Sequence, residues 1–151
     1  MEHKPFVELQ AIAEVRSPES QEWMSREQRL ERWIALLRAD PDRKLRSLNE
    51  IEHLPQATRR ECRSENSPLT VAYEDPLLRS AGLKSDRVGD CTDFFDLSDR
   101  EMHFAFCSCH VGMRLSGYEA AERLDHILQR DAWRRKLRST VSSLFGRIFR
   151  A

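Results

Sequence analysis

The chain has 151 residues, a length typical of one domain, and 33 % of them are charged. Its 25 basic and 25 acidic residues cancel, which excludes a globally basic nucleic-acid-binding protein. No window approaches the roughly 18 apolar residues of a membrane span, and no secretory signal pattern opens the sequence. We therefore expect a cytoplasmic protein with reduced thiols at Cys62, Cys91, Cys107 and Cys109.

Helix-start signals recur along the chain. A serine followed three residues later by Glu or Gln forms a capping box, in which the two side chains satisfy exposed amides at the helix start. The pattern occurs at Ser25, Ser47, Ser98 and Ser116. Pro68 and Pro76 each follow a capping residue, where a missing N–H costs nothing. These signals predict many short helices.

Apolar residues recur at helical spacing between these signals. The expected helices and helical turns, in chain order, are 5–15, 26–38, 47–53, 55–62, 68–74, 76–81, 86–95, 99–109, 117–129 and 131–149. Strand evidence is thin, because no window alternates apolar and polar residues over more than four positions. The sequence predicts an all-α fold, a single compact domain of six to eight mostly short helices with a basic amphipathic C-terminal helix.

Three parts are expected along the chain. Residues 1–24 form an N-terminal helix and linker, residues 25–129 a helical core domain, and residues 130–151 the basic amphipathic helix. Charge separates the last part from the rest. Seven basic residues and one acid give residues 130–151 a charge of +6, so residues 1–129 carry −6.

A cluster of histidines and cysteines occupies the stretch His-Phe-Ala-Phe-Cys-Ser-Cys-His. On a continuous helix, His103, Cys107 and His110 fall within about 60° of one face. Cys91 on the preceding helix is a candidate fourth ligand, and zinc accepts such a nitrogen and sulfur set. The alternative is structural: His103 and Cys107 are half-buried helix residues and Cys109 is a small core residue.

Enzyme signatures are missing from the sequence. No phosphate-binding glycine loop, zinc-protease helix motif or serine-hydrolase elbow occurs. Gly89-Asp90-Cys91 resembles the setting of a nucleophilic cysteine, but no oxyanion hole or orienting group accompanies it. We expect a non-enzymatic protein without a cofactor, and zinc is the alternative.

An apolar stripe runs along the C-terminal helix, with Arg, Lys, Ser and Thr opposite it. This helix is a core element, a membrane-surface helix on anionic lipid, or a helix that lies in a groove on another protein. Nucleic acid is disfavoured, because the aromatic residues do not alternate with arginine. The candidate partner or membrane surface consists of Trp133, Arg134, Arg135, Leu137, Arg138, Val141, Leu144, Phe145 and Ile148.

The favoured function is binding to another protein, as an adaptor or regulator. The alternatives are a zinc-binding protein that uses the histidine and cysteine cluster, or a peripheral membrane protein anchored by the C-terminal helix.

Overall fold

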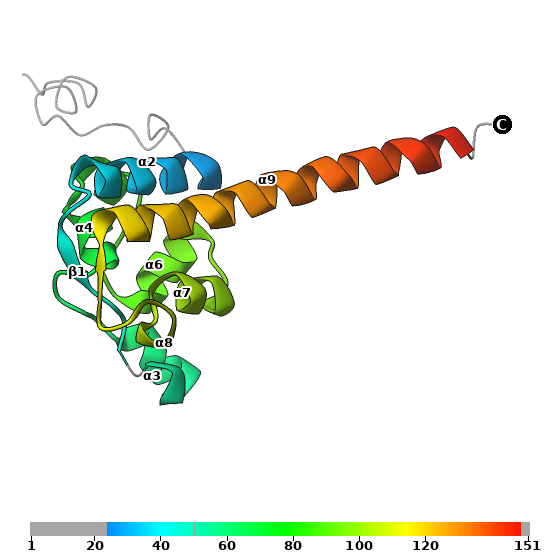
Figure 1. Cartoon of the computed structure of the whole chain (residues 1–151). Coiled ribbons are helices and arrows are strands. Elements are labelled where there is room, and N and C mark those ends of the chain that lie inside the picture. Colours follow the sequence, from blue (N-terminus) through cyan, green and yellow to red (C-terminus); the bar gives the residue numbers. More distant parts are fainter. Residues whose placement is uncertain (1–23, 50, 149–151) are drawn as a thin grey trace, which may run out of the picture.

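The computed structural model describes residues 24–49 and 51–148, with side chains as far as Ser139 (Figure 1). Eight α-helices, one 3-10 turn and two short strands occur among these residues. In chain order they are α2 (Arg26–Ala39), β1 (Lys44–Arg46), η2 (Ile51–His53), α3 (Gln56–Glu61), α4 (Pro68–Glu74), α5 (Pro76–Ser80), α6 (Val88–Phe95), α7 (Asp99–Phe106), α8 (Ser108–Val111), β2 (Arg114–Ser116) and α9 (Gly117–Ile148). The predicted helical fold is confirmed; the expected helix 5–15 lies outside the described residues.

The core forms where α2 lies antiparallel to the first half of α9, with the shorter helices packed beneath them (Figure 1). Trp33 is fully buried at its centre. Its indole N–H donates to the carbonyl of Pro68 at 2.9 Å, so the polar end of the ring is paired. Its ring stacks on Phe95 at 4.2 Å and lies 5.3 Å from Phe106. One aromatic cluster therefore joins α2, α6 and α7.

Most predicted helix starts are confirmed. Full capping boxes begin α2 at Ser25 and α7 at Ser98, and Ser116 and Glu119 make the same pair of bonds at the start of α9. Ser67 caps α4 through Thr70. These signals succeed because each uses contacts within four neighbouring residues.

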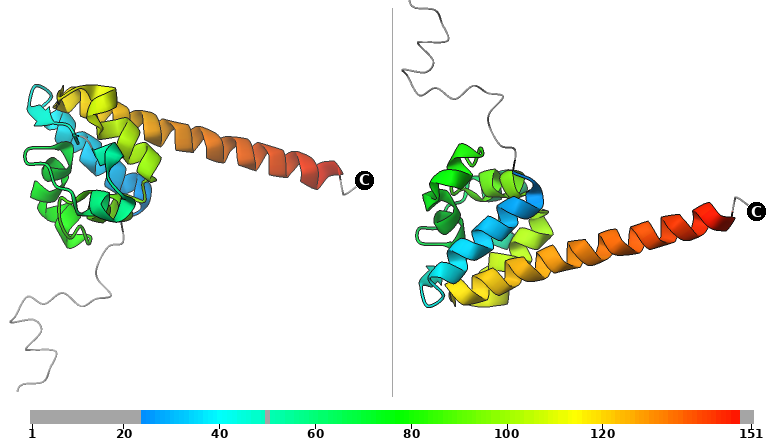
Figure 2. Two further views of the ribbon diagram at one scale, coloured as in Figure 1. Left: turned by 90° about the horizontal axis from the view of Figure 1, so that it is seen from below. Right: turned by 90° about the horizontal axis from the view of Figure 1, so that it is seen from above.

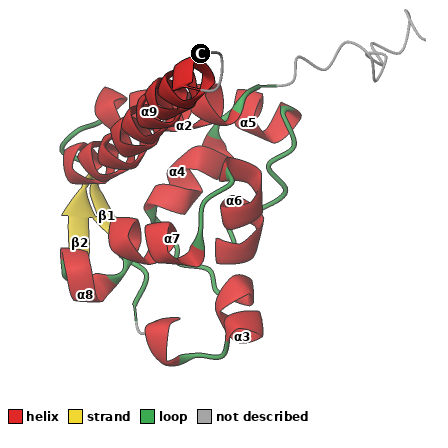
Figure 3. Ribbon diagram, turned by 90° about the vertical axis from the view of Figure 1, so that its right-hand side faces the viewer, coloured by secondary structure: helices red, strands yellow, loops and turns green. Residues whose placement is uncertain are grey.

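The expected helix at residues 47–53 is wrong. Ser47 follows β1 directly, and helical geometry begins at Ile51 as a 3-10 turn. β1 lies beside β2 (Figure 3) and pairs antiparallel with it. Leu45 is opposite Leu115, and both leucines are buried. The sequence does not predict this sheet, because strands of three residues are too short to show a period of two.

α9 is one continuous helix of 32 residues where the sequence suggested two segments. Its first residue lies against the end of α2. A Cβ atom at Gly117 would come within 2.3 Å of the Asp40 carbonyl oxygen and 2.7 Å of that of Leu37. The backbone N–H groups of Gly117 and Tyr118 donate to Arg43 and Pro41 at 3.0 Å each. The second half of α9 extends beyond the body of the protein in both views of Figure 2.

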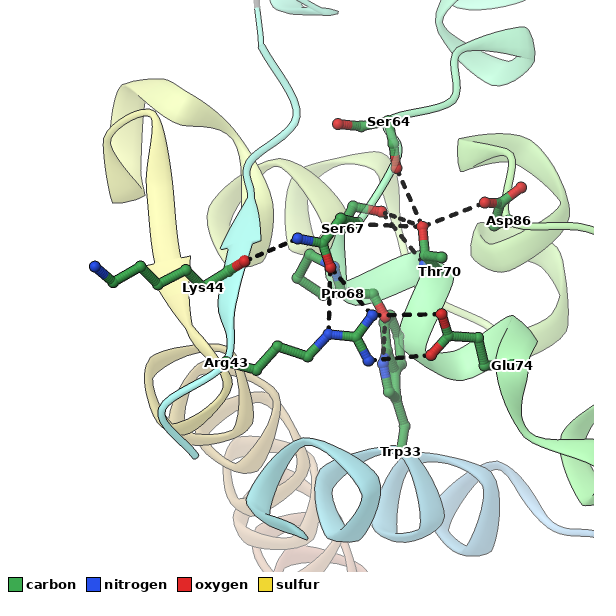
Figure 4. Close-up of polar contacts among 10 residues, drawn as sticks. Trp33, Arg43, Lys44, Ser64, Ser67, Pro68, Thr70, Glu74 and Asp86 are labelled. Carbon is green, nitrogen blue, oxygen red and sulfur yellow. Dashed lines mark hydrogen bonds and ion pairs between the residues drawn. The ribbon is translucent and has the colours of Figure 1, made fainter. Parts of the chain in front are cut away.

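Polar side chains in the body form hydrogen bonds and ion pairs in which a donor faces an acceptor. The Arg43 guanidinium donates to Glu74 and to Asn66, and Thr70 donates to the buried carboxylate of Asp86 (Figure 4). Asp75, also buried, accepts two bonds from the Arg32 guanidinium and caps α5 through the Leu78 amide. These contacts hold the pKa of Asp75 below its usual range, Arg32 being the largest cause.

Candidate functional site

The chain turns sharply at Cys107, between α7 and α8. Cys107 is extended, with φ −71° and ψ 137°, and forms an isolated parallel bridge with Leu48. The Leu48 N–H donates to the Phe106 carbonyl at 2.8 Å, and the Ser108 N–H donates to the Leu48 carbonyl at 2.9 Å. The expected continuous helix 99–109 is therefore wrong, because the backbone of Leu48, after β1, pairs with the backbone around Cys107 and interrupts the helix there.

The turn brings five potential metal ligands together, and we call them the cysteine corner: Glu52, His103, Cys107, Cys109 and His110. Cys109 is central. Its Sγ atom lies 3.4 Å from His103 Nε2 and 3.2 Å from Cys107 Sγ. The Cys107 thiol in turn donates to Glu52 Oε2 at 3.1 Å, and the two histidine rings meet edge to face at 4.9 Å.

The ligand set differs from the predicted one. His103 and His110 are brought together, but the cysteine close to both is Cys109 in place of Cys107. One potential ligand atom from each of His103, Cys109 and His110 lies within 4.8 Å of the other two. Cys107 belongs to a second group, with Glu52 and Cys109. The helix break is the reason, since on a straight helix Cys109 would lie on a different face from the histidines.

Cys91 does not join the corner. It lies on α6, is fully buried, and donates its thiol to the Ser85 carbonyl at 3.5 Å. Burial, with Asp86 and Asp90 nearby, raises the pKa of this thiol far above its ordinary value. The Sγ atom of Cys91 lies outside both groups of potential ligands, so the structure places Cys91 apart from His103 and His110.

The corner combines buried and exposed groups. Cys107 is buried, His103 is half-buried, and Cys109 and His110 are exposed. Burial raises the pKa of the Cys107 thiol to about 12, and the neighbouring Glu52 carboxylate adds to this. The hydrogen bond from Cys107 is the largest cause of a lowered pKa at Glu52. Without a cation, Cys107 remains a protonated thiol at neutral pH.

An open groove of about 440 Å³ lies between the corner and the start of α9. Its lining includes the exposed rings of Phe104 and Tyr118 together with His110. The Arg123 guanidinium lies 5.2 Å from the centre of the Phe104 ring and donates to the carbonyls of Phe104 and His110 at 2.8 and 3.2 Å. Arg123 thus fixes α8 against α9.

The second candidate site is the exposed part of α9. Trp133 is 62 % exposed and Leu137 is 44 % exposed, while Arg134, Arg135 and Arg138 are exposed beside them. The remaining predicted surface residues lie on α9 beyond the described side chains; these are Val141, Leu144, Phe145 and Ile148.

Ion pairs mark the point where α9 leaves the body. Arg26 of α2 pairs with Asp131 at 2.6 Å, and Arg130 pairs with Glu101 of α7 at 2.6 Å. Arg135 pairs with Glu27, one turn further along. These contacts hold α9 against α2 as far as about residue 135, past the predicted boundary at residue 129.

Comparison with known proteins adds no assignment: no family model matches, and no curated protein or solved structure matches the chain. Among the helices of the described residues, none combines the length and apolar character that crossing a membrane requires.

Proposed function

We propose that the protein is a non-enzymatic helical binding module that acts as an adaptor or regulator. Its distal α9 surface, defined by Trp133, Leu137 and the flanking arginines Arg134 and Arg138, would lie in an apolar groove with an acidic rim on another protein. The exposure of Trp133, at 62 %, carries this proposal. Tryptophan is strongly enriched among the residues that dominate binding energy, because it buries much apolar area on contact.

The direction of the surface supports a partner outside this domain. Leu124 and Ile127 are fully buried on the side of α9 that faces the body. At about 100° per residue, Trp133 lies on about the opposite side of the helix from Leu124. The distal surface therefore faces away from the protein's own core.

Charge favours a protein groove over a lipid surface. The C-terminal segment is cationic, which suits a partner with carboxylates around an apolar groove. Anionic lipid attracts each nearby cation by about 1 kcal/mol. Two of the cations on α9, Arg130 and Arg135, are already paired with Glu101 and Glu27.

We propose a cytoplasmic location, which suits the four free cysteines.

A photo-crosslinking amino acid at Leu137 tests the proposal in lysate of the native host. The crosslinked protein is then purified and titrated with the unmodified chain and with the Trp133→Ala, Leu137→Ala double variant. We expect the double variant to weaken binding by at least about 30-fold, since dominant interface residues contribute 2 kcal/mol or more. The Arg134→Glu, Arg138→Glu double variant should weaken binding more at low salt than at high salt, because salt screens the charges.

Met113→Ala is the matched control, because Met113 is a similarly exposed apolar residue, at 65 %, that is not part of α9. Vesicles of phosphatidylserine and phosphatidylcholine form a second arm. If the chain binds these vesicles through Trp133 and no protein partner requires Trp133, a peripheral membrane role would replace the proposal. A captured protein that binds the double variant equally well would contradict it.

A further inference from the structure

The cysteine corner lies outside the distal α9 surface, and the proposed function does not use it. We infer that it is a zinc site, with His103, Cys109 and His110 as three ligands and Cys107 as the fourth.

Two distances between donor atoms in the corner resemble edges of a zinc coordination tetrahedron. With Zn–S near 2.3 Å and Zn–N near 2.0–2.1 Å, tetrahedral ligands lie about 3.8 Å apart for two sulfurs and about 3.6 Å for sulfur and nitrogen. In the corner, the Sγ atoms of Cys107 and Cys109 are 3.2 Å apart, and Cys109 Sγ lies 3.4 Å from His103 Nε2. Small side-chain adjustments would satisfy both distances. The Cys107 thiol is grouped with Glu52 and Cys109 and not with the histidines, so it would rotate away from Glu52 to reach an ion held by the other three ligands.

The corner contrasts with the other polar clusters of the body. Around Arg43 and Thr70, strong donors face strong acceptors (Figure 4). In the corner, the central contact is between two thiols, which are weak donors and weak acceptors. A divalent cation would replace this weak contact with coordinate bonds, and no Lys or Arg side chain is paired with Glu52, Cys107 or Cys109 among the described contacts.

The ligand types select zinc among common divalent ions. Thiolate and imidazole suit zinc, whereas magnesium and calcium prefer oxygen ligands. Binding is an exchange without redox change: two Zn–S bonds form as the Cys107 and Cys109 thiols release two protons to solvent. The two thiolates then balance the charge of the ion, and neutral His103 and His110 complete the shell.

The backbone around the corner is already fixed. The bridge from Leu48 holds Cys107, and the Ser108 hydroxyl contacts Asn49 Oδ1 at 3.1 Å. The bond from Arg123 holds the His110 carbonyl. Such supporting contacts reduce the ordering cost of binding, because the ligands need only side-chain rotation.

Glu52 competes with Cys107 for the fourth position, since both are grouped with Cys109. We assign Cys107, because sulfur is the better zinc ligand beside a second thiolate. Comparing Cys107→Ser with Glu52→Gln separates the two assignments.

The test uses the full chain, reduced with a phosphine and free of chelator, titrated first with Co²⁺ and then with Zn²⁺. We expect one metal per chain by native mass spectrometry, intense tetrahedral cobalt bands in visible absorption, and displacement of cobalt by zinc. Cys109→Ser and His103→Ala should weaken zinc binding by at least about 10–100-fold, the loss typical of even supporting residues. Glu52→Gln should bind zinc with the affinity of the unaltered chain.

Cys62→Ser and His126→Ala are the matched controls, because these residues lie outside both ligand groups. Circular dichroism verifies the fold of each variant; Cys109 and His110 are exposed, so their substitution leaves the core intact. Octahedral or absent cobalt bands in the unaltered chain would overturn the site. Equal losses in the control variants would do the same. If Glu52→Gln loses zinc and Cys107→Ser retains it, the assignment of the fourth ligand is wrong.

Discussion

The two halves of α9 belong to one helix but have different surroundings. In the first half, Ala120, Ala121, Leu124 and Ile127 are fully buried against α2 and the helices below it. In the second half, Trp133 and Leu137 are 62 % and 44 % exposed. An apolar stripe therefore predicts the helix in both halves, but only the three-dimensional packing shows which half is covered.

The halves also differ in how the backbone is held. Gly117 brings the start of α9 within contact distance of the last turn of α2, and the ion pairs of Arg130, Asp131 and Arg135 end this contact. Beyond them, Leu137 is 44 % exposed and Arg138 is exposed, so these described side chains bury little surface against the body. The first half is thus a structural element, and the second half carries the exposed surface that we propose for binding.

The largest expected difference is between Leu124→Ala and Leu137→Ala. Leu124→Ala should lower the free energy of unfolding by about 2–5 kcal/mol, because it leaves a cavity in the core. Leu137→Ala should change it by no more than about 0.5 kcal/mol, as is usual for exposed positions. Urea unfolding followed by circular dichroism measures both. A comparable cost at Leu137 would mean that the protein itself covers the distal half.

Two glycines in α9 should respond in opposite directions. Gly117→Ala should destabilise the protein by about 1–3 kcal/mol, since its Cβ atom would overlap backbone atoms of Asp40 and Leu37. Gly146→Ala in the distal half should favour the helix by about 1 kcal/mol, the difference in propensity between the two residues. Thermal unfolding measures the first, and far-UV circular dichroism the second. An unchanged melting temperature for Gly117→Ala would show that the ends of α2 and α9 separate easily.

Two truncations locate the boundary between the halves. A chain that ends at Lys136 keeps the ion pairs of Arg130, Asp131 and Arg135, so its stability should match that of the full chain. A chain that ends at Gln129 loses all three and should be less stable by about 0.6–3 kcal/mol, at roughly 0.2–1 kcal/mol for each pair. It should still unfold cooperatively. Loss of folding at Gln129 would extend the structural half of α9 and remove support for a binding role there.

Local signals in the sequence predicted most of the fold. Ser25 and Ser98 start helices through side chains three residues away, and Pro68 and Pro76 follow their capping residues as expected. Ser47 shows the limit of such signals. It has the same pattern, but it directly follows β1, whose pairing with β2 imposes extended backbone.

The arrangement of the candidate ligands depends on a contact that the sequence does not reveal. The rings of His103 and His110 lie 4.9 Å apart, but no sequence pattern shows that Leu48 pairs with Cys107 and interrupts the helix. That distant backbone contact brings Cys109 to His103. Cys91 was chosen because it lies on the preceding helix, yet its side chain is buried elsewhere, in contact with Ser85.

The smallest expected effect is at the ion pair formed by Glu27 of α2 and Arg135 of α9. Both side chains are substantially exposed, so a double-mutant cycle with Glu27→Gln and Arg135→Gln should give a coupling of about 0.2–1 kcal/mol at low salt. Salt near 1 M should reduce it, because the Debye length falls to about 3 Å.

The same pair predicts a dependence on pH. Glu27 lies in the first turn of α2, and backbone hydrogen bonding there, followed by the bond from Arg135, lowers its pKa from the ordinary value of 4.5. A carboxyl group with a lowered pKa in the folded state stabilises the protein above its unfolded pKa and loses this effect as the pH falls through the folded value. Unfolding free energies at about pH 7 and about pH 3 should therefore show a smaller coupling between Glu27 and Arg135 at the lower pH. A coupling of the same size at both pH values would mean that α9 is held at this point by packing rather than by charge, and the boundary between its two halves would then lie beyond Arg135.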